Sequence, residues 1–144
     1  MSKSYYSEIN LHLVWHTKGN LPLLTPEIEK QAHRHRRHRL ITTHGCYVHE
    51  IGGTVTHVHI AVTIPPTVTI SEMIGQLKGA SSHEVNHSNP TRDKLQWQAG
   101  YGVVSFGTKD LEWVREYVRH QKEHHAGRRV FDRLERITEF ETAG

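Results

Sequence analysis

The chain has 144 residues, 35% of them hydrophobic, and a formal net charge of +3 at pH 7. This size and composition exclude a disordered chain and favour one folded domain whose core needs no disulfide, and the single Cys46 cannot form an intramolecular bridge. Neither a signal-peptide pattern nor an apolar run of about 18 residues occurs, so we expect a cytoplasmic protein without a membrane segment.

The periodicity of apolar residues predicts strands and helices in alternation. In chain order we expect a strand over 4–17, a helix over 25–43, strands over 46–51 and 55–64, a helix over 71–86, a short strand over 102–107 and one helix over 108–125. Gly52-Gly53 is expected to form a turn or bulge between the two middle strands. This order predicts an α+β, ferredoxin-like sandwich with a mostly antiparallel sheet.

We expect a single domain over residues 1–144, with a short tail from about residue 128 that either packs on the domain or stays loose. A ferredoxin-like sandwich hosts RNA binders, metal carriers and nucleases, so the fold alone does not select a function. The side chains must do so.

Histidine pairs are the first candidates for chemistry. With 14 histidines in the chain, the two His-x-His triplets are expected by chance, and only their local structure separates them. His33 and His35 fall on a predicted helix, where residues two apart point about 200° from each other. His57 and His59 fall on a predicted strand and share one face about 7 Å apart, either as two-thirds of a metal site or as solvent-facing side chains.

A tyrosine on the last predicted helix is the candidate nucleophile. Tyr117 and Gln121 are four residues apart and face the same direction on that helix. Tyr117 is either a half-buried core residue or a nucleophile whose phenolate attacks a phosphorus polarised by a nearby cation. Two imidazoles and the Gln121 amide oxygen would leave coordination positions open for phosphate on Mg²⁺ or Mn²⁺.

Basic side chains on the two earlier helices are candidate DNA contacts. They are Arg34, Arg36, Arg37, Arg39 and Lys78. The alternative for all five is a solvated helix surface with no ligand. Trp97 and Tyr101 are candidates for stacking on unpaired bases, although a core position for Trp97 is equally consistent with the sequence.

Several segments, in order, resemble one family of enzymes. They are Leu13-Val14-Trp15-His16-Thr17-Lys18, Thr56-His57-Val58-His59-Ile60 and the stretches 77–82, 97–102 and 117–125. Together they resemble the HUH single-strand DNA transposases with one catalytic tyrosine, which include small insertion-sequence transposases and relatives tied to repetitive extragenic palindromes. The similarity extends from about Ser4 to Phe131.

The resemblance implies a role for each candidate. His57, His59 and Gln121 would hold the divalent metal ion, and Tyr117 would form a 5'-phosphotyrosine link while freeing a 3'-hydroxyl. The substrates would be single-stranded DNA ends folded into hairpins. The enzyme would be a homodimer in which the tyrosine helix can complete the partner's active site.

Two positions depart from the family pattern. The residues before the first histidine are usually Pro-Asp, where this chain has Val55-Thr56, and the position before the glutamine is commonly Asn, where it has His120. We therefore expect a metal-dependent transposase that cleaves and rejoins single-stranded DNA. The alternatives are a non-catalytic or domesticated hairpin-binding protein on the same fold and, less favoured in so short a chain, a nicking enzyme for replication or conjugation.

Overall fold

A computed structural model describes residues 4–126 and 131–137 of the chain. Its strands are β1 (Ile9–His16), β2 (Tyr47–Gly53), β3 (His57–Ile64) and β4 (Gly102–Phe106). Its α-helices are α1 (Pro26–Thr42), α2 (Ile70–Ser88), α3 (Leu111–Arg119) and α4 (Gln121–Ala126). Three short 3₁₀ segments, Lys18–Asn20, Thr108–Asp110 and Asp132–Leu134, complete the described elements.

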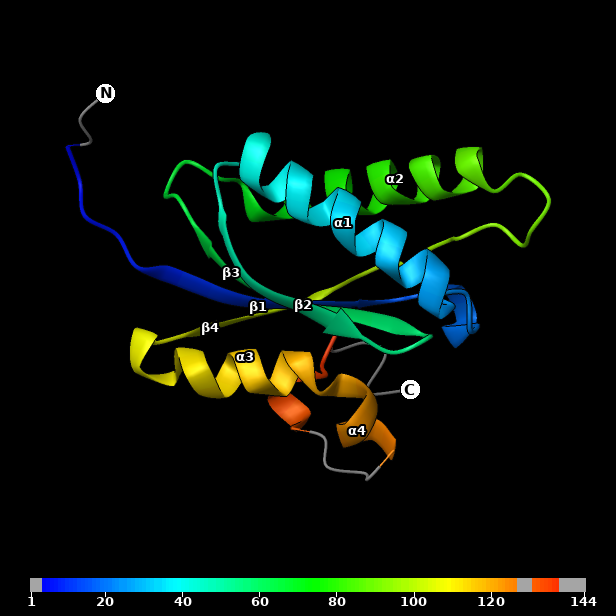
Figure 1. The fold of residues 1–144 in the computed structure, drawn as a ribbon. Coiled ribbons are helices and arrows are strands. Elements are labelled where there is room, and N and C mark those ends of the chain that lie inside the picture. The colour runs from blue at the N-terminus through cyan, green and yellow to red at the C-terminus, as the bar shows by residue number, and fades with distance from the viewer. Residues whose placement is uncertain (1–3, 127–130, 138–144) are drawn as a thin grey trace.

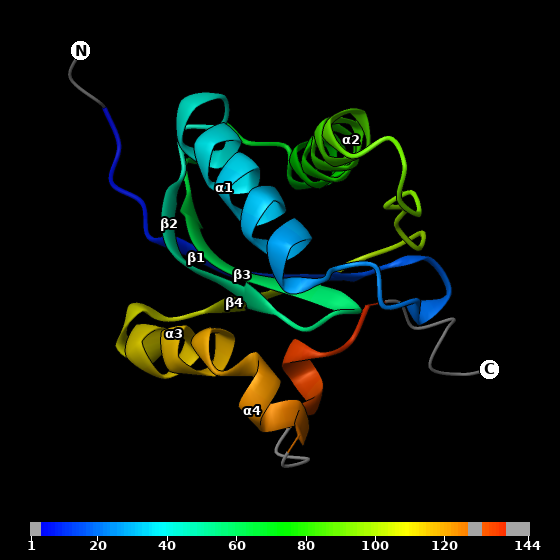
Figure 2. The same ribbon diagram turned by 45° about the vertical axis from the view of Figure 1, so that its right-hand side comes forward.

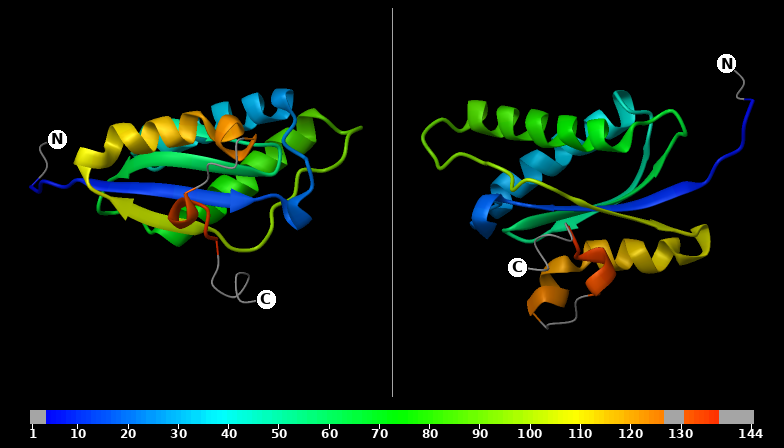
Figure 3. Two further views of the ribbon diagram at one scale, coloured as in Figure 1. Left: turned by 90° about the horizontal axis from the view of Figure 1, so that it is seen from below. Right: turned by 180° about the vertical axis from the view of Figure 1, so that it is seen from behind.

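The strands form one antiparallel sheet in the order β2-β3-β1-β4. Helices α1 and α2 connect β1 to β2 and β3 to β4, and both lie side by side on one face of the sheet (Figures 1 and 2). Helices α3 and α4 cover the other face, where the 3₁₀ segment Asp132–Leu134 lies against β1 and β4 (Figure 3). The predicted element order and α+β sandwich are confirmed. No helix among the described residues is long and apolar enough to cross a membrane.

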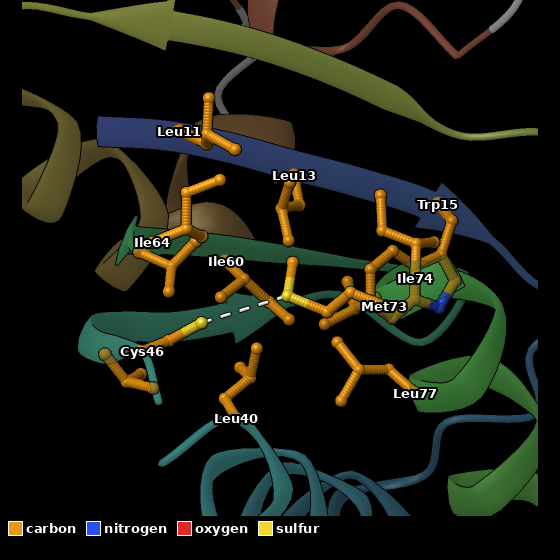
Figure 4. Close-up of a cluster of buried hydrophobic side chains, with 13 residues drawn as sticks. Leu11, Leu13, Trp15, Leu40, Cys46, Ile60, Ile64, Met73, Ile74 and Leu77 are labelled. Atoms are coloured by element: carbon orange, nitrogen blue, oxygen red, sulfur yellow. Dashed lines mark hydrogen bonds between the residues drawn. The ribbon is translucent and has the colours of Figure 1, made fainter. Parts of the chain in front are cut away.

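The two central strands divide their side chains between the faces of the sheet. Alternate residues of β1 and β3, among them Leu13 and Ile60, join Met73 and Leu77 of α2 in the main core beneath α1 and α2 (Figure 4). On the other face, Ala61 packs against Val114 and Val118 of α3. Since successive strand residues point in opposite directions, burying Val58 and Ile60 in the main core turns His57 and His59 toward α3.

The expected turn or bulge at Gly52-Gly53 is wrong. Both glycines belong to β2 and pair with His59 and Val58, while the strand irregularity lies between Val48 and Glu50. The reason is close packing: a Cβ added to Gly52 would overlap the backbone carbonyl of Val118. Glycine therefore serves here to let α3 approach the sheet.

Replacing Gly52 with Ala is expected to displace α3, because the atom in the way belongs to the backbone. We expect a loss of unfolding free energy of about 1–3 kcal/mol, typical of an overpacked site, measured by thermal or urea denaturation. Gly75→Ala in α2 is the matched control, because an added Cβ there meets nothing within 4 Å. The control should be neutral or stabilising by about 0.5–1 kcal/mol. Equal melting curves for the two variants would contradict this role of Gly52.

The single helix expected over 108–125 is divided. Helix α3 ends at Arg119, His120 has non-helical φ and ψ of −103° and 31°, and α4 begins at Gln121. Lys122 then donates to a Glu29 carboxylate oxygen at 2.7 Å and to the Gly53 carbonyl at 3.1 Å. These contacts to α1 and β2 hold α4, and the periodicity of the helix sequence contains no sign of them.

Candidate active site

The histidine pair lies in the interior between the sheet and α3. His57 and His59 are both buried, and their ring centroids are 5.0 Å apart. On the neighbouring strand β1, the His16 ring stacks on His57 at 4.8 Å, and the His12 ring lies 4.8 Å from His59. The predicted orientation of the pair on one strand face is confirmed, and the solvent-facing alternative is excluded.

Each ring of the pair is held through its Nδ1 atom. His59 Nδ1 lies 2.7 Å from His12 Nε2, and His57 Nδ1 lies 2.9 Å and 3.0 Å from the Thr54 and Thr56 hydroxyls. Burial and the nearby His59 hold the pKa of His12 well below its ordinary value, so His12 is neutral at pH 7. Fixing Nδ1 orients Nε2 of both rings toward a shared space, the usual arrangement of metal-binding histidines.

The residue that enters this space is Glu135, which follows the 3₁₀ segment of the tail. One of its carboxylate oxygens lies 3.2 Å from His59 Nε2 and 3.7 Å from His57 Nε2. Among the described residues, His57, His59 and Glu135 are a group of potential metal ligands whose donor atoms lie within 4.8 Å of one another. Glu135 is not among the predicted site residues, because nothing near it in the chain marks it as one.

Tyr117 joins the same group from α3. Its side chain is buried, its hydroxyl donates to the second Glu135 carboxylate oxygen, and it accepts a hydrogen bond from the Phe131 backbone at 2.7 Å. Burial is the main cause that raises the pKa of Tyr117, and the bond to Glu135 adds to it. The phenol is therefore protonated at neutral pH in this state. Histidine pair, tyrosine and carboxylate thus meet within a single chain.

Gln121, at the start of α4, is also buried and lies against Tyr117. Its side-chain Nε2 donates to the Tyr117 carbonyl oxygen at 2.9 Å. The amide oxygen is then the end of the side chain with the chemistry of a metal ligand. Two imidazoles together with an amide or carboxylate oxygen suit a divalent cation such as Mn²⁺. The residues present therefore fit the divalent metal ion that the sequence predicts.

The predicted arginine patch is partly wrong. Arg36 is fully buried, with its guanidinium 5.0 Å from the Trp97 ring and 5.7 Å from the Trp15 ring. Its Nη1 atom lies 3.0 Å from His33 Nδ1. Burial lowers its pKa to about 9. Arg36 is therefore a core cation held between aromatic rings, not a surface contact. Its position four residues after Ala32 and before Leu40 places it on the buried stripe of α1.

The remaining basic candidates lie on the side of the sheet away from Tyr117. Arg34 and Arg37 are exposed on α1 and Arg39 is partly exposed, and Arg34 borders a cavity of about 510 Å³ between α1 and α2. Lys78 on α2 donates to the carbonyls of Gln98 and Gly100 at 2.9 Å and 3.1 Å. Lys78 thus orders the segment before β4, and its contact with DNA stays a prediction.

Trp97 occupies the core position that the sequence left open. Its indole Nε1 donates to the Lys78 carbonyl at 2.8 Å, and its ring meets Trp15 edge to face at 6.2 Å. Tyr101 also packs against the main core. Both residues are half-buried, so their stacking on unpaired bases stays a prediction. Residues 127–130, where the tail was expected to begin, lie outside the described residues, whereas 131–137 pack on the domain and bury Leu134.

Comparison with known proteins places these features in a family. The sequence model of the family described as "Transposase IS200 like" matches residues 5–121, most of the chain. This match includes the histidine pair, Tyr117 and Gln121, and it ends before Glu135.

Two curated relatives are similar to part of the chain. The transposases of insertion sequence IS200 from Salmonella typhimurium strain LT2 and Salmonella typhi are each 32% identical to the chain over 72 residues, 46% of this chain and 47% of theirs. The aligned part of the chain spans about half the length of these relatives.

Two solved structures share the fold. A candidate transposase from Deinococcus radiodurans R1 has a TM-score of 0.67 and 20% identity, covering 82% of this chain and 94% of that one. A REP-associated tyrosine transposase bound to a REP hairpin has a TM-score of 0.61 and 17% identity, covering 87% of this chain and 73% of that one. The chain therefore belongs to the family of IS200-like transposases.

Proposed function

We propose that the chain is a metal-dependent transposase that cleaves and rejoins single-stranded DNA at hairpin-marked ends, with Tyr117 as the nucleophile. One observation carries the proposal: the Tyr117 hydroxyl and the His57 and His59 rings converge on the same anion, the Glu135 carboxylate. A DNA phosphodiester is also a compact anion with projecting oxygens. A phosphodiester in the position of the Glu135 carboxylate would lie between the imidazoles and the Tyr117 hydroxyl.

The proposed reaction exchanges one phosphodiester for another. The Tyr117 oxygen forms a bond to phosphorus, the bond from phosphorus to the 3'-oxygen breaks, and the 3'-oxygen takes up a proton to become a hydroxyl. The phenol proton passes to solvent. Rejoining is the reverse attack by a 3'-hydroxyl, so the sequence of steps needs no ATP.

The side chains around Tyr117 have separate tasks. His57, His59 and Gln121 would hold Mg²⁺ or Mn²⁺, which when bound supplies positive charge that polarises the phosphate and favours the phenolate. His12, Thr54 and Thr56 fix the histidine rings. Exposed arginines on α1 would contact DNA phosphates beyond the reacting one, which makes binding depend on salt.

The nearest competing function is DNA hairpin binding without cleavage. The observation that favours it is the engagement of the Tyr117 hydroxyl by both Glu135 and the Phe131 backbone. Incubation with a labelled single-stranded hairpin from the DNA flanking the gene, with Mn²⁺ or with EDTA, separates the two. A transposase forms a covalent protein–DNA adduct in the presence of Mn²⁺ and none in EDTA. A non-catalytic protein shifts the hairpin without forming an adduct.

Assembly and location are proposed on the family resemblance. We propose a homodimer that works in the cytoplasm, where its DNA lies. Tyr117 and the histidine pair meet within one chain, which supports a site assembled within one subunit. Completion by the partner's helix is the alternative.

Two single variants decide whether Gln121 or Glu135 is the third metal ligand. We expect Gln121→Ala to weaken Mn²⁺ binding by about tenfold or more, measured by titration calorimetry, because an amide ligand is lost. Glu135→Ala should retain adduct formation or increase it, because the carboxylate that occupies the phosphate position is removed. Glu72→Ala, at an exposed position of α2, is the matched acidic control. Loss of Mn²⁺ affinity in Glu135→Ala, with Gln121→Ala unchanged, would assign the ligand to Glu135 instead.

A further inference from the structure

An exposed aromatic pair lies next to the proposed nucleophile. Trp113 is 52% exposed and Phe131 is 42% exposed, and their rings meet edge to face at 5.1 Å. Trp113 lies one turn before Tyr117 on α3, and the two rings are nearly parallel, with centroids 5.5 Å apart. Two large apolar rings therefore remain open to solvent beside the buried phenol.

The packing of the domain does not explain the position of Trp113. The sheet-facing side of α3 is already filled by Val114 and Val118, which pack against Ala61. Of the three tryptophans, Trp15 is buried and Trp97 is half-buried, so Trp113 is the exposed one. Exposed apolar surface that is grouped and borders a functional site is typical of a binding surface.

A cavity continues from this pair along the edge of the sheet. Its volume is about 340 Å³, near the lower end for small-ligand sites, and it is lined by the edge strand β4, α3 and the tail. Phe106 and Leu134 contribute apolar walls, and Arg133 contributes a cation. The Asp110 carboxylate also lines the cavity and can accept a hydrogen bond from the amino group of a base. A partly apolar cavity with one cation and one carboxylate matches a nucleobase attached to a phosphate.

We propose that Trp113, Phe131 and this cavity form a stacking subsite for one unpaired nucleobase next to the scissile phosphate. The proposal rests on the proposed function, because a phosphate at Tyr117 places the neighbouring nucleotide within reach of the Trp113 ring. Every base has a π-face, so aromatic stacking holds a single strand with little sequence preference. Arg133 is exposed and lines the cavity, and its guanidinium would contact an adjacent phosphate.

The test measures binding without cleavage. In EDTA, the wild type is titrated with an oligodeoxyadenylate of about 10 nucleotides, a length within the site sizes of single-strand binding folds, and with an abasic strand of equal length. We expect the wild type to prefer the strand with bases by about tenfold, the size of one base–aromatic stack. We also expect quenching of tryptophan fluorescence. Trp113→Ala should lose most of the preference and the quenching, and its affinity for the abasic strand should stay unchanged.

Two further variants control for folding and for aromatic exposure. Trp113→Phe should recover part of the preference for bases, since a phenyl ring also stacks. Tyr47→Ala removes another exposed ring on β2 and should behave as the wild type. Equal preference in wild type and Trp113→Ala, a parallel loss for both strands, or a change only in self-association would overturn the subsite. Because this titration contains no metal, an absent covalent adduct in the separate Mn²⁺ assay would reject the proposed reaction and leave this binding result intact.

Discussion

Tyr117→Phe is expected to abolish the covalent protein–DNA adduct, lowering its rate of formation by about three orders of magnitude or more, as for loss of a nucleophile. The phenyl ring retains the contacts of Tyr117 with His59 and Trp113. Only the oxygen that attacks phosphorus is lost. Hairpin affinity, measured by gel shift, should therefore change little.

The Tyr117→Phe variant also loses folding stability, so a control must separate this loss from the loss of the nucleophile. The Tyr117 hydroxyl donates to Glu135 and accepts from the Phe131 backbone, so its loss is expected to cost about 1–2 kcal/mol of unfolding free energy. Tyr101→Phe is the matched control, because Tyr101 packs on the main core across the sheet from α3. It should form adduct at the wild-type rate. An undiminished adduct in Tyr117→Phe would remove Tyr117 as the nucleophile.

The double variant His57→Ala with His59→Ala is expected to lose divalent metal binding. We expect Mn²⁺ affinity to fall more than about 100-fold. Mutating residues that only hydrogen-bond to metal ligands already lowers metal affinity about 10–100-fold, and here the ligands themselves are removed. Adduct formation should disappear with it. Hairpin binding should persist, because the exposed arginines of α1 lie on the other face of the sheet. Calorimetry and gel shift on the same preparation measure both quantities.

A second histidine pair provides the control. His83 and His87 are stacked at 6.2 Å on the exposed surface of α2, so their double alanine variant removes the same side chains away from Tyr117. It should retain metal binding and adduct formation. If the His57 and His59 variant fails to fold, while the wild type is destabilised by metal removal, the metal is structural and the catalytic role falls.

The sequence predicts those parts of the site that depend on local geometry. The period of two along β3 places Val58 and Ile60 in the core and so turns His57 and His59 together toward α3. The rejection of His33 and His35 as a metal pair follows from helical geometry in the same way. The element order predicts the sandwich, because α1 and α2 each connect two strands that are not neighbours in the sheet.

The parts that sequence reasoning misses depend on contacts between distant segments. Gly52 has the composition of a turn, but its role is set by the Val118 carbonyl of α3. Arg36 has the charge of a surface residue, but Trp15 and Trp97 enclose its guanidinium. Glu135 enters the site only because the tail folds back onto the sheet. No periodicity within a single element contains this information.

We propose that a strand and a helix, far apart in sequence, form one site in which DNA is transferred to Tyr117. The most direct measurement is mass spectrometry of the protein–DNA adduct after nuclease and protease digestion. We expect a nucleotide linked through its 5'-phosphate to the peptide that contains Tyr117, formed only when a divalent metal ion is present. A link to any other residue, or no link on the hairpin that the protein binds, would contradict it.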